Sequence, residues 1–112
     1  MEPLLIIEKG GVYRWYLNGL LHRLDAPAVI HFDGTKEWFI HGKHHRDDGP
    51  AITCSNGSQM WYKHGDLHRT DGPAIIWEDG TRLFYINGKR ISGHDIELFD
   101  TEEGRLILKL KY

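Results

Sequence analysis

The sequence predicts an all-β protein, an elongated antiparallel meander in a single twisted sheet, and three observations lead to that prediction. The first is a 23-residue repeat that begins with an aromatic residue, at Trp15, Trp38, Trp61 and Phe84. The second is a pair of turn signals in each unit, Asn-Gly or His-Gly and then Asp-Gly or Asn-Gly, which favour β-hairpins because such turns need a positive φ. The third is that the segments between turns are short and β-rich, whereas nothing before residue 93 has helical periodicity. Together they predict roughly seven to nine strands, growing by one hairpin per unit.

We expect one domain over residues 1–112, with three full units between two capping segments. The units are 15–37, 38–60 and 61–83, followed by a partial unit at 84–94. Residues 1–14 supply a capping strand and a partial unit, with Leu4–Ile7 paired to Gly11–Leu17. Residues 95–112 are a short cap outside the repeat, in which Asp95–Phe99 forms a helical turn and Arg105–Tyr112 a strand with its leucines on one face.

Counting outward from two-residue turns predicts the register and the two faces of the sheet. The strands are expected at 35–40, 51–54, 59–63 and 74–77, with positive φ at Gly19, Gly42, Gly65 and Gly88. Each Trp then faces the His seven residues later, in the pairs Trp15–His22, Trp38–His45 and Trp61–His68. On their other side Trp38, Trp61 and Phe84 would face Val29, Ile52 and Ile75. In the last unit Trp becomes Phe84 and its partner becomes Ile91, a joint change that supports the register.

The opposite face would carry a second aromatic row, Tyr16, Phe39, Tyr62 and Tyr85, beside Ala28, Ala51 and Ala74. Small alanines next to large rings would let the sheet curl toward this side, so we expect it to be concave.

Composition excludes some classes of protein. Lys plus Arg is 14 and Asp plus Glu is 16, so the chain lacks the basic excess of a general nucleic-acid binder. The single cysteine, Cys54, excludes an internal disulfide framework and fits a reducing compartment. The first seven residues do not resemble a signal peptide, and no apolar run approaches the ~20 residues of a membrane helix. We therefore expect a cytoplasmic protein.

The repeat unit has the sequence motif Trp-Tyr-x-Asn-Gly-x-x-His-Arg-x-Asp-Gly-Pro-Ala, followed by Asp-Gly-Thr, and it recurs over about residues 10–94. It resembles a variant of the MORN repeat, which also has 23 residues, a Tyr/Trp start, an Asn-Gly-Lys turn and a closing Asp-Gly. The resemblance implies an elongated single-layer sheet that serves as a scaffold or protein-binding surface; phospholipid binding is also claimed for the family. Where a usual unit has His-Gly-x-Gly, this chain has His-Arg-x-Asp-Gly-Pro, like units in phage, bacterial and large-virus proteins.

Two rows of polar residues, the arginines and the histidines, are candidates for ligand binding, metal binding or catalysis. Arg23, Arg46 and Arg69 could hold phosphates or carboxylates, but an Asp two residues later in every unit favours an internal pair that braces the turn. Equivalent histidines lie two strands apart, or ~9.6 Å, so they cannot share a zinc ion, and we expect no metal and no cofactor. Because each row repeats the same residues without a singular nucleophile, catalysis is disfavoured.

The leading function is therefore non-catalytic binding of a protein partner by an aromatic face, and the resemblance suggests a phage-type accessory or anti-host factor acting in the host cytoplasm. The alternative is a binder of a small anionic ligand or nucleotide, and the third reading is a His/Asp hydrolase or nuclease. The residues expected to bind are Tyr16, Phe39, Tyr62, Tyr85, Arg46 and Arg69. Those expected to pack or to self-associate in a homodimer are Trp15, Trp38, Trp61, His45 and His68.

Overall fold

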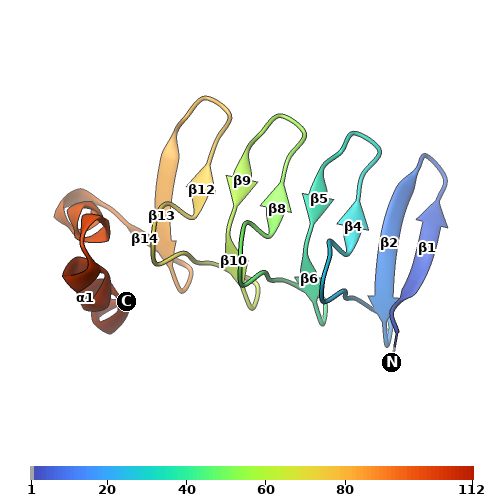
Figure 1. Ribbon diagram of the computed structural model, residues 1–112, viewed down its shortest axis with the longest axis horizontal. Helices are drawn as coiled ribbons and strands as arrows, with labels where there is room; N and C mark the ends of the chain where they lie inside the picture. Colours follow the sequence, from blue (N-terminus) through green and yellow to red (C-terminus); the bar gives the residue numbers. More distant parts are fainter. Residues whose placement is uncertain (1) are drawn as a thin grey trace.

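The computed structural model describes residues 2–112 and shows an open antiparallel meander of 47 × 32 × 18 Å, in which hairpins stand side by side in one layer (Figure 1). The main ladder runs β1-β2-β4-β5-β8-β9-β12-β13-β14, with β3 paired to β2. Its strands are β1 (Leu4–Glu8), β2 (Val12–Leu17), β3 (Leu20–Leu21), β4 (Val29–Ile30), β5 (Lys36–Glu37), β8 (Ile52–Thr53), β9 (Gln59–Met60), β12 (Ile75–Ile76), β13 (Arg82–Ile86) and β14 (Lys89–Ile91). Two short pairs complete the hairpins, β6 (Phe39–Ile40) with β7 (Lys43–His44) and β10 (Tyr62–Lys63) with β11 (Asp66–Leu67). The predicted antiparallel meander is confirmed.

The tight turn at the start of each unit has the predicted geometry. Both central residues have positive φ, in Asn18-Gly19, His41-Gly42, His64-Gly65 and Asn87-Gly88. This is the type I′ turn, which matches the twist of the two strands that it joins. The His22 amide donates to the Trp15 carbonyl at 2.9 Å, and equivalent bonds join His45 to Trp38 and His68 to Trp61. The predicted Trp–His register is therefore confirmed.

The second turn of each unit is wider than predicted. The His31 amide donates to the Thr35 carbonyl at 2.8 Å, and Gly34 alone has positive φ in this loop, so three residues lie between the strands rather than two. The same bonds recur from Cys54 to Ser58 and from Trp77 to Thr81. As a result Val29 pairs with Glu37, Ile52 with Met60 and Ile75 with Leu83, and the predicted partners Trp38, Trp61 and Phe84 are wrong by one residue.

This one-residue difference moves the aliphatic row to the other face. Val29 also lies opposite Arg14, which shares a face of β2 with Tyr16. Val29 packs with Phe39 and Leu21 in one cluster. We define the Tyr face by its two rows: Tyr16, Phe39, Tyr62 and Tyr85, and Val29, Ile52, Met60, Ile75 and Leu83. The Trp face carries Trp15, Trp38, Trp61 and Phe84.

The strands are also shorter than predicted, and two of them are interrupted at Trp38 and at Trp61. The expected strand 35–40 consists of β5 and β6, separated by Trp38. The Trp38 amide donates to the Ala51 carbonyl of the same unit at 2.7 Å, while the Trp38 carbonyl accepts from the His45 amide at 3.1 Å. Trp38 and Trp61 thus lie where the chain leaves the long ladder for a tight hairpin, whereas β2 continues through Trp15 without a break.

The C-terminal strand predicted at Arg105–Tyr112 is wrong. The tail forms a 3₁₀-helix, η1 (Gly93–Asp100), and an α-helix, α1 (Glu102–Lys111). Thr101 caps α1, since its Oγ1 accepts from the Gly104 amide at 2.9 Å, and acidic residues fill the first turn while lysines fill the last. Leu108 is buried whereas Leu110 is 91% exposed, so the leucines do not share one face.

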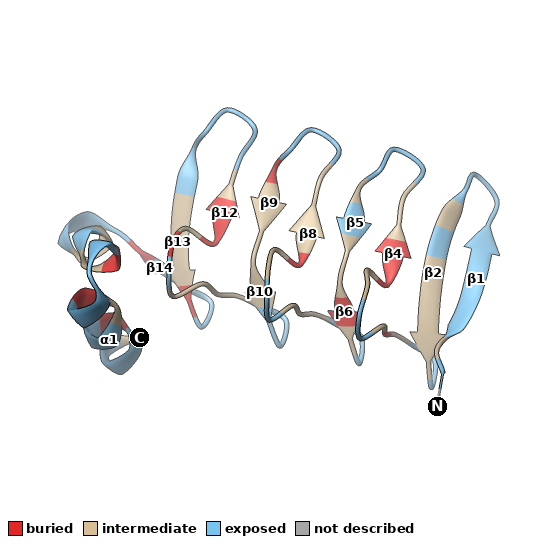
Figure 2. Cartoon of the chain, in the orientation of Figure 1, coloured by how far each residue is buried: buried red, intermediate tan, exposed pale blue. Residues whose placement is uncertain are grey.

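The helical cap packs on the last hairpin. Phe99 and Leu108 form a core with Ile86 and Ile91, and Phe84 packs against it; Figure 2 shows this buried group at the end of the sheet. Phe84 lies opposite Ile91, at the positions of Trp and His in earlier units. The joint change to apolar residues therefore buries the Trp face of the last hairpin under the cap.

Candidate functional site

On the Trp face each indole ring is covered by the arginine of its own unit. The Cζ atoms of Arg23, Arg46 and Arg69 lie 3.8, 4.0 and 4.0 Å from the ring centroids of Trp15, Trp38 and Trp61. Each Nη1 also donates to a proline carbonyl four residues later, at 3.2, 3.1 and 3.1 Å. The row that could have formed an anion-binding ladder is thus largely engaged in stacking and in holding the irregular loop before each Pro.

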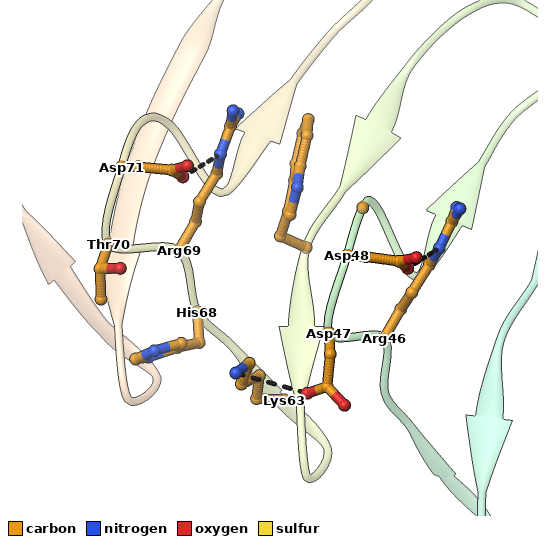
Figure 3. Close-up of a pocket in the computed structure, with 10 residues that line it drawn as sticks. Arg46, Asp47, Asp48, Lys63, His68, Arg69, Thr70 and Asp71 are labelled. Atoms are coloured by element: carbon orange, nitrogen blue, oxygen red, sulfur yellow. Dashed lines mark hydrogen bonds and ion pairs between the residues drawn. The ribbon is translucent and has the colours of Figure 1, made fainter. Parts of the chain in front are cut away.

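Two of the three arginines make the expected carboxylate pair. Arg46 Nε donates to Asp48 at 3.1 Å and Arg69 Nε to Asp71 at 2.9 Å (Figure 3). The carboxylate side chains of Asp48 and Asp71 are 84% and 74% exposed. The guanidinium groups face inward onto the indoles and the carboxylates face solvent.

Arg23 is the exception. Among residues 2–112 no carboxylate lies within ion-pair distance of it, and its one side-chain hydrogen bond is to Pro27. The position between Asp and Pro is Ala26 here, and Gly49 or Gly72 in the other units. A Cβ at Gly49 would lie 2.9 Å from Arg46 Cζ, closer than such atoms approach. The methyl of Ala26 would crowd the guanidinium in the arrangement seen in the later units, and Arg23 is the arginine that lacks the aspartate pair.

The histidines of the Trp face join one unit to the next. Nδ1 of His22, His45 and His68 accepts the backbone amide of His41, His64 and Asn87 at 2.9, 3.0 and 2.9 Å. Each Nδ1 must therefore be unprotonated. Burial lowers the pKa of His22 and, together with Lys63, that of His68, which favours the neutral acceptor. No group of three ligands suited to a metal occurs among residues 2–112.

A second set of links between units, which the sequence interpretation missed, lies at the wide turns. Thr35 Oγ1 accepts from the Ser55 amide at 3.1 Å, and Ser58 Oγ accepts from the Glu78 amide at 3.0 Å. The signal was present as the Thr or Ser that follows each closing Gly. Both ends of each hairpin are thus tied to the next by a side chain.

Between these links the Trp face is hollowed. One hollow, of about 440 Å³, lies between the loop Arg46–Gly49 and Trp61, Lys63 and Arg69, and Figure 3 shows Lys63 reaching back to Asp47. A second of about 420 Å³ surrounds Arg23, and a third of about 240 Å³ lies beside Trp38.

The Tyr face holds one polar cluster that no other unit repeats. Glu37 accepts from His31 Nε2 at 2.7 Å and from His44 Nε2 at 2.9 Å. The bond from His44, followed by that from His31, lowers the pKa of Glu37 to about 2, against the cost of its burial. The positions equivalent to Glu37 hold Arg14, Met60 and Leu83.

Aromatic rings flank this cluster. The His44 ring lies 4.1 Å from that of Phe39 and 5.0 Å from that of Tyr62, so two predicted binding residues and a histidine form one stack. Tyr16 and Tyr85 occupy the same row in neighbouring hairpins, opposite Leu21 and Arg90. Glu37 was missed because its two partners are brought to it only by the true register.

The other predicted residues lie elsewhere. Arg46 and Arg69 stack on the Trp face, so they do not form one site with Phe39, Tyr62 and Tyr85. Trp38, Trp61, His45 and His68 pack within and between units.

None of the helices between residues 2 and 112 is long and apolar enough to span a membrane. Comparison with protein families, with curated proteins and with solved structures gives no match to this chain. The resemblance to MORN repeats therefore stays a prediction, as does every activity or partner that it implies.

Proposed function

We propose that this protein is a non-catalytic binding module that engages a protein partner through its Tyr face. The observation that carries the proposal is an apolar row on a one-layer sheet that the chain covers only in part, since Val29 and Ile75 are buried whereas Ile52, Met60 and Leu83 remain partly exposed. The register places Val29, Ile52, Met60, Ile75 and Leu83 in one row across the units, interrupted by Glu37. The helices η1 and α1 pack at the end of the sheet, against Ile86 and Ile91, and within residues 2–112 no second layer lies over this row.

The composition of the surface suits a protein partner. Tyr62, Tyr85, Met60 and Leu83 remain partly exposed, and contiguous apolar surface of this kind usually marks an interaction site. Aromatic residues dominate the binding energy of protein interfaces because they bury a large area at little entropic cost. The cluster centred on Glu37 adds an oriented charged group within this apolar surface, where it can select a partner with a complementary donor.

The one cysteine supports a non-catalytic role. Burial, and secondarily the charges of Glu37 and Asp33, raises the pKa of the Cys54 thiol. The thiol is the poorly nucleophilic form, whereas reactive cysteines lie in environments that favour the thiolate.

Consecutive residues of β9 provide a matched test, since Met60 lies on the Tyr face and Gln59 on the Trp face. The tagged protein and the variants Met60→Glu and Gln59→Glu would be used to capture partners from the cells that produce it, with quantification by mass spectrometry. We expect Met60→Glu to lower recovery of a specific partner by tenfold or more, about 1.4 kcal/mol, whereas Gln59→Glu leaves recovery unchanged.

Melting curves and light scattering on the same variants separate binding from folding and from self-association. If Met60→Glu retains the melting temperature and the partner, the Tyr face is not the binding surface. If the wild type is a dimer and Met60→Glu a monomer, the face serves a second copy of this chain instead. Capture of a host protein would in addition support the expected anti-host role.

A further inference from the structure

We propose that the hollow around Arg23 is a binding site for a carboxylate group carried by a peptide segment. The hollow has a volume of about 420 Å³ and is lined by Glu2, Pro3, Trp15, His22 and Arg23–Ala26. It lies on the Trp face, opposite the proposed partner surface, so it is a separate site and does not depend on that proposal.

The first argument is a comparison of three equivalent arginines within one chain. Arg46 and Arg69 donate Nε to an aspartate and Nη1 to a proline carbonyl. Arg23 makes only the second bond, so within residues 2–112 its Nε and Nη2 have no acceptor. Nε and Nη2 form the edge of the guanidinium that binds a carboxylate by two parallel hydrogen bonds. In the first unit this edge of the guanidinium is therefore open to a ligand, whereas in the other two units its Nε is bonded to an aspartate.

The second argument is that the guanidinium is already held in position. Its Cζ lies 3.8 Å from the Trp15 ring centroid, and Nη1 is fixed to the Pro27 carbonyl at 3.2 Å. A group that is oriented before binding loses less conformational entropy when the ligand arrives. The fold therefore fixes the plane of the Arg23 guanidinium before a ligand binds.

The third argument concerns why the internal partner is missing. Ala26 replaces the glycine of the later units, where a Cβ would come within 2.9 and 3.0 Å of the arginine Cζ. Asp25 lines the same hollow but does not reach Arg23, which leaves room for an external carboxylate in the place of Asp48 or Asp71.

The surroundings favour a peptide over a free small acid. Leu24, 64% exposed, and Pro3 give the rim an apolar side that can pack on a side-chain stem or a backbone. Glu2 and Asp25 repel a free anion, so binding needs these additional contacts.

The arginine Nε–H resonances in NMR spectra report on the three sites at once. The protein would be titrated at constant ionic strength with the amide of Gly-Gly-Glu-Gly-Gly, with its glutamine analogue, with acetate and with phosphate. We expect the glutamate peptide to shift the Arg23 resonance in a saturable way and more tightly than acetate, while the Arg46 and Arg69 resonances, already bonded to aspartates, stay in place.

The variant Ala26→Gly is the matched control, because it restores the residue that the later units carry and should fold. Asp25 can then close on Arg23, and the resulting internal competitor should weaken the response to the peptide by about fivefold. An unchanged response in Ala26→Gly overturns the proposal. So does an absent shift at Arg23, an equal shift at all three arginines, or an equal effect of the glutamine peptide. If phosphate binds more tightly than the peptide, the site is one for phosphate and not for a carboxylate. If acetate binds as tightly as the peptide, the site recognises a carboxylate without a peptide segment.

Discussion

Removal of the Arg69 side chain tests what holds each unit together. Arg69→Ala deletes three contacts: the stack on Trp61 at 4.0 Å, the bond to the Pro73 carbonyl at 3.1 Å and the pair with Asp71 at 2.9 Å. A cation over a partly exposed indole contributes about 0.5–2 kcal/mol. A charged donor to a carbonyl adds about 1.5 kcal/mol. An ion pair with a carboxylate as exposed as Asp71 adds less than ~1 kcal/mol. Since these contributions overlap, we expect a loss of about 2–3 kcal/mol in the free energy of unfolding.

The assay is urea unfolding followed by circular dichroism, with thermal melts alongside. At about 2.1 cal/mol/K per residue, a chain of 112 residues loses roughly 4 °C in melting temperature per kcal/mol, so Arg69→Ala should melt about 8–12 °C lower. Arg69→Lys keeps the charge but not the planar fork and should lose most of this stability. Asp71→Asn is the matched control for the ion pair and should cost less than ~1 kcal/mol.

The reasoning is refuted if Asp71→Asn destabilises the protein as much as Arg69→Ala. That result would mean that the exposed ion pair, rather than the stack on Trp61 and the bond to Pro73, stabilises the loop. A wild-type melting curve for Arg69→Ala would show that the row serves only binding.

Three further outcomes are expected. Burial lowers the pKa of His68 and of His22 below 6.5, so the unfolded chain binds more protons than the folded protein. The free energy of unfolding should therefore fall as the pH drops below about 6.5, and it should fall less in His68→Gln. Urea titrations at pH 7.5 and pH 5 would measure this difference. Glu37, with its pKa lowered from 4.5 to about 2, stabilises the fold above pH 4.5 and loses that effect toward pH 2. Glu37→Gln should therefore cost about 1–3 kcal/mol at pH 6 and little at pH 2.5 in the same assay. Gly104→Ala would drive a Cβ into the Leu98 carbonyl, so hydrogen exchange should show α1 detached while the sheet stays protected.

The tight turns could be predicted because their chemistry is local. Asn18-Gly19 and its equivalents need positive φ at two adjacent residues, and few sequences allow it. Asp33-Gly34 was ambiguous, since a Gly with positive φ also closes a three-residue loop with a bulge. Counting outward from the wrong loop length shifts every partner by one, which exchanges the two faces for the whole aliphatic row.

The tail shows a different limit. Leu106, Leu108 and Leu110 alternate as in a strand, yet a strand also needs an edge with which to pair. The Thr101 cap, the acidic first turn and a run of good helix formers favour a helix locally. The outcome also depends on the last hairpin, where Phe84 and Ile91 present an apolar surface that Leu108 covers. That complementarity exists only between segments and could not be derived from the periodicity of either.

Function should lie where one unit departs from the others, because the repeated polar residues are engaged inside the fold. The arginines at 46 and 69 close on their own aspartates, and the histidines accept amides from the next unit, so few of their donors and acceptors remain for a ligand. Two departures place a polar group outside the repeated pattern: the Arg23 guanidinium beside Ala26, whose Nε and Nη2 have no acceptor within residues 2–112, and the Glu37 carboxylate, which His31 and His44 hold on the Tyr face. They lie on opposite faces of a sheet only one layer thick, so neither can act as a second partner in the site of the other. A partner that needed both groups would have to wrap around an edge, whereas two separate partners could bind at the same time. Loss of the same captured partner in Met60→Glu and in Ala26→Gly would favour the wrapped arrangement.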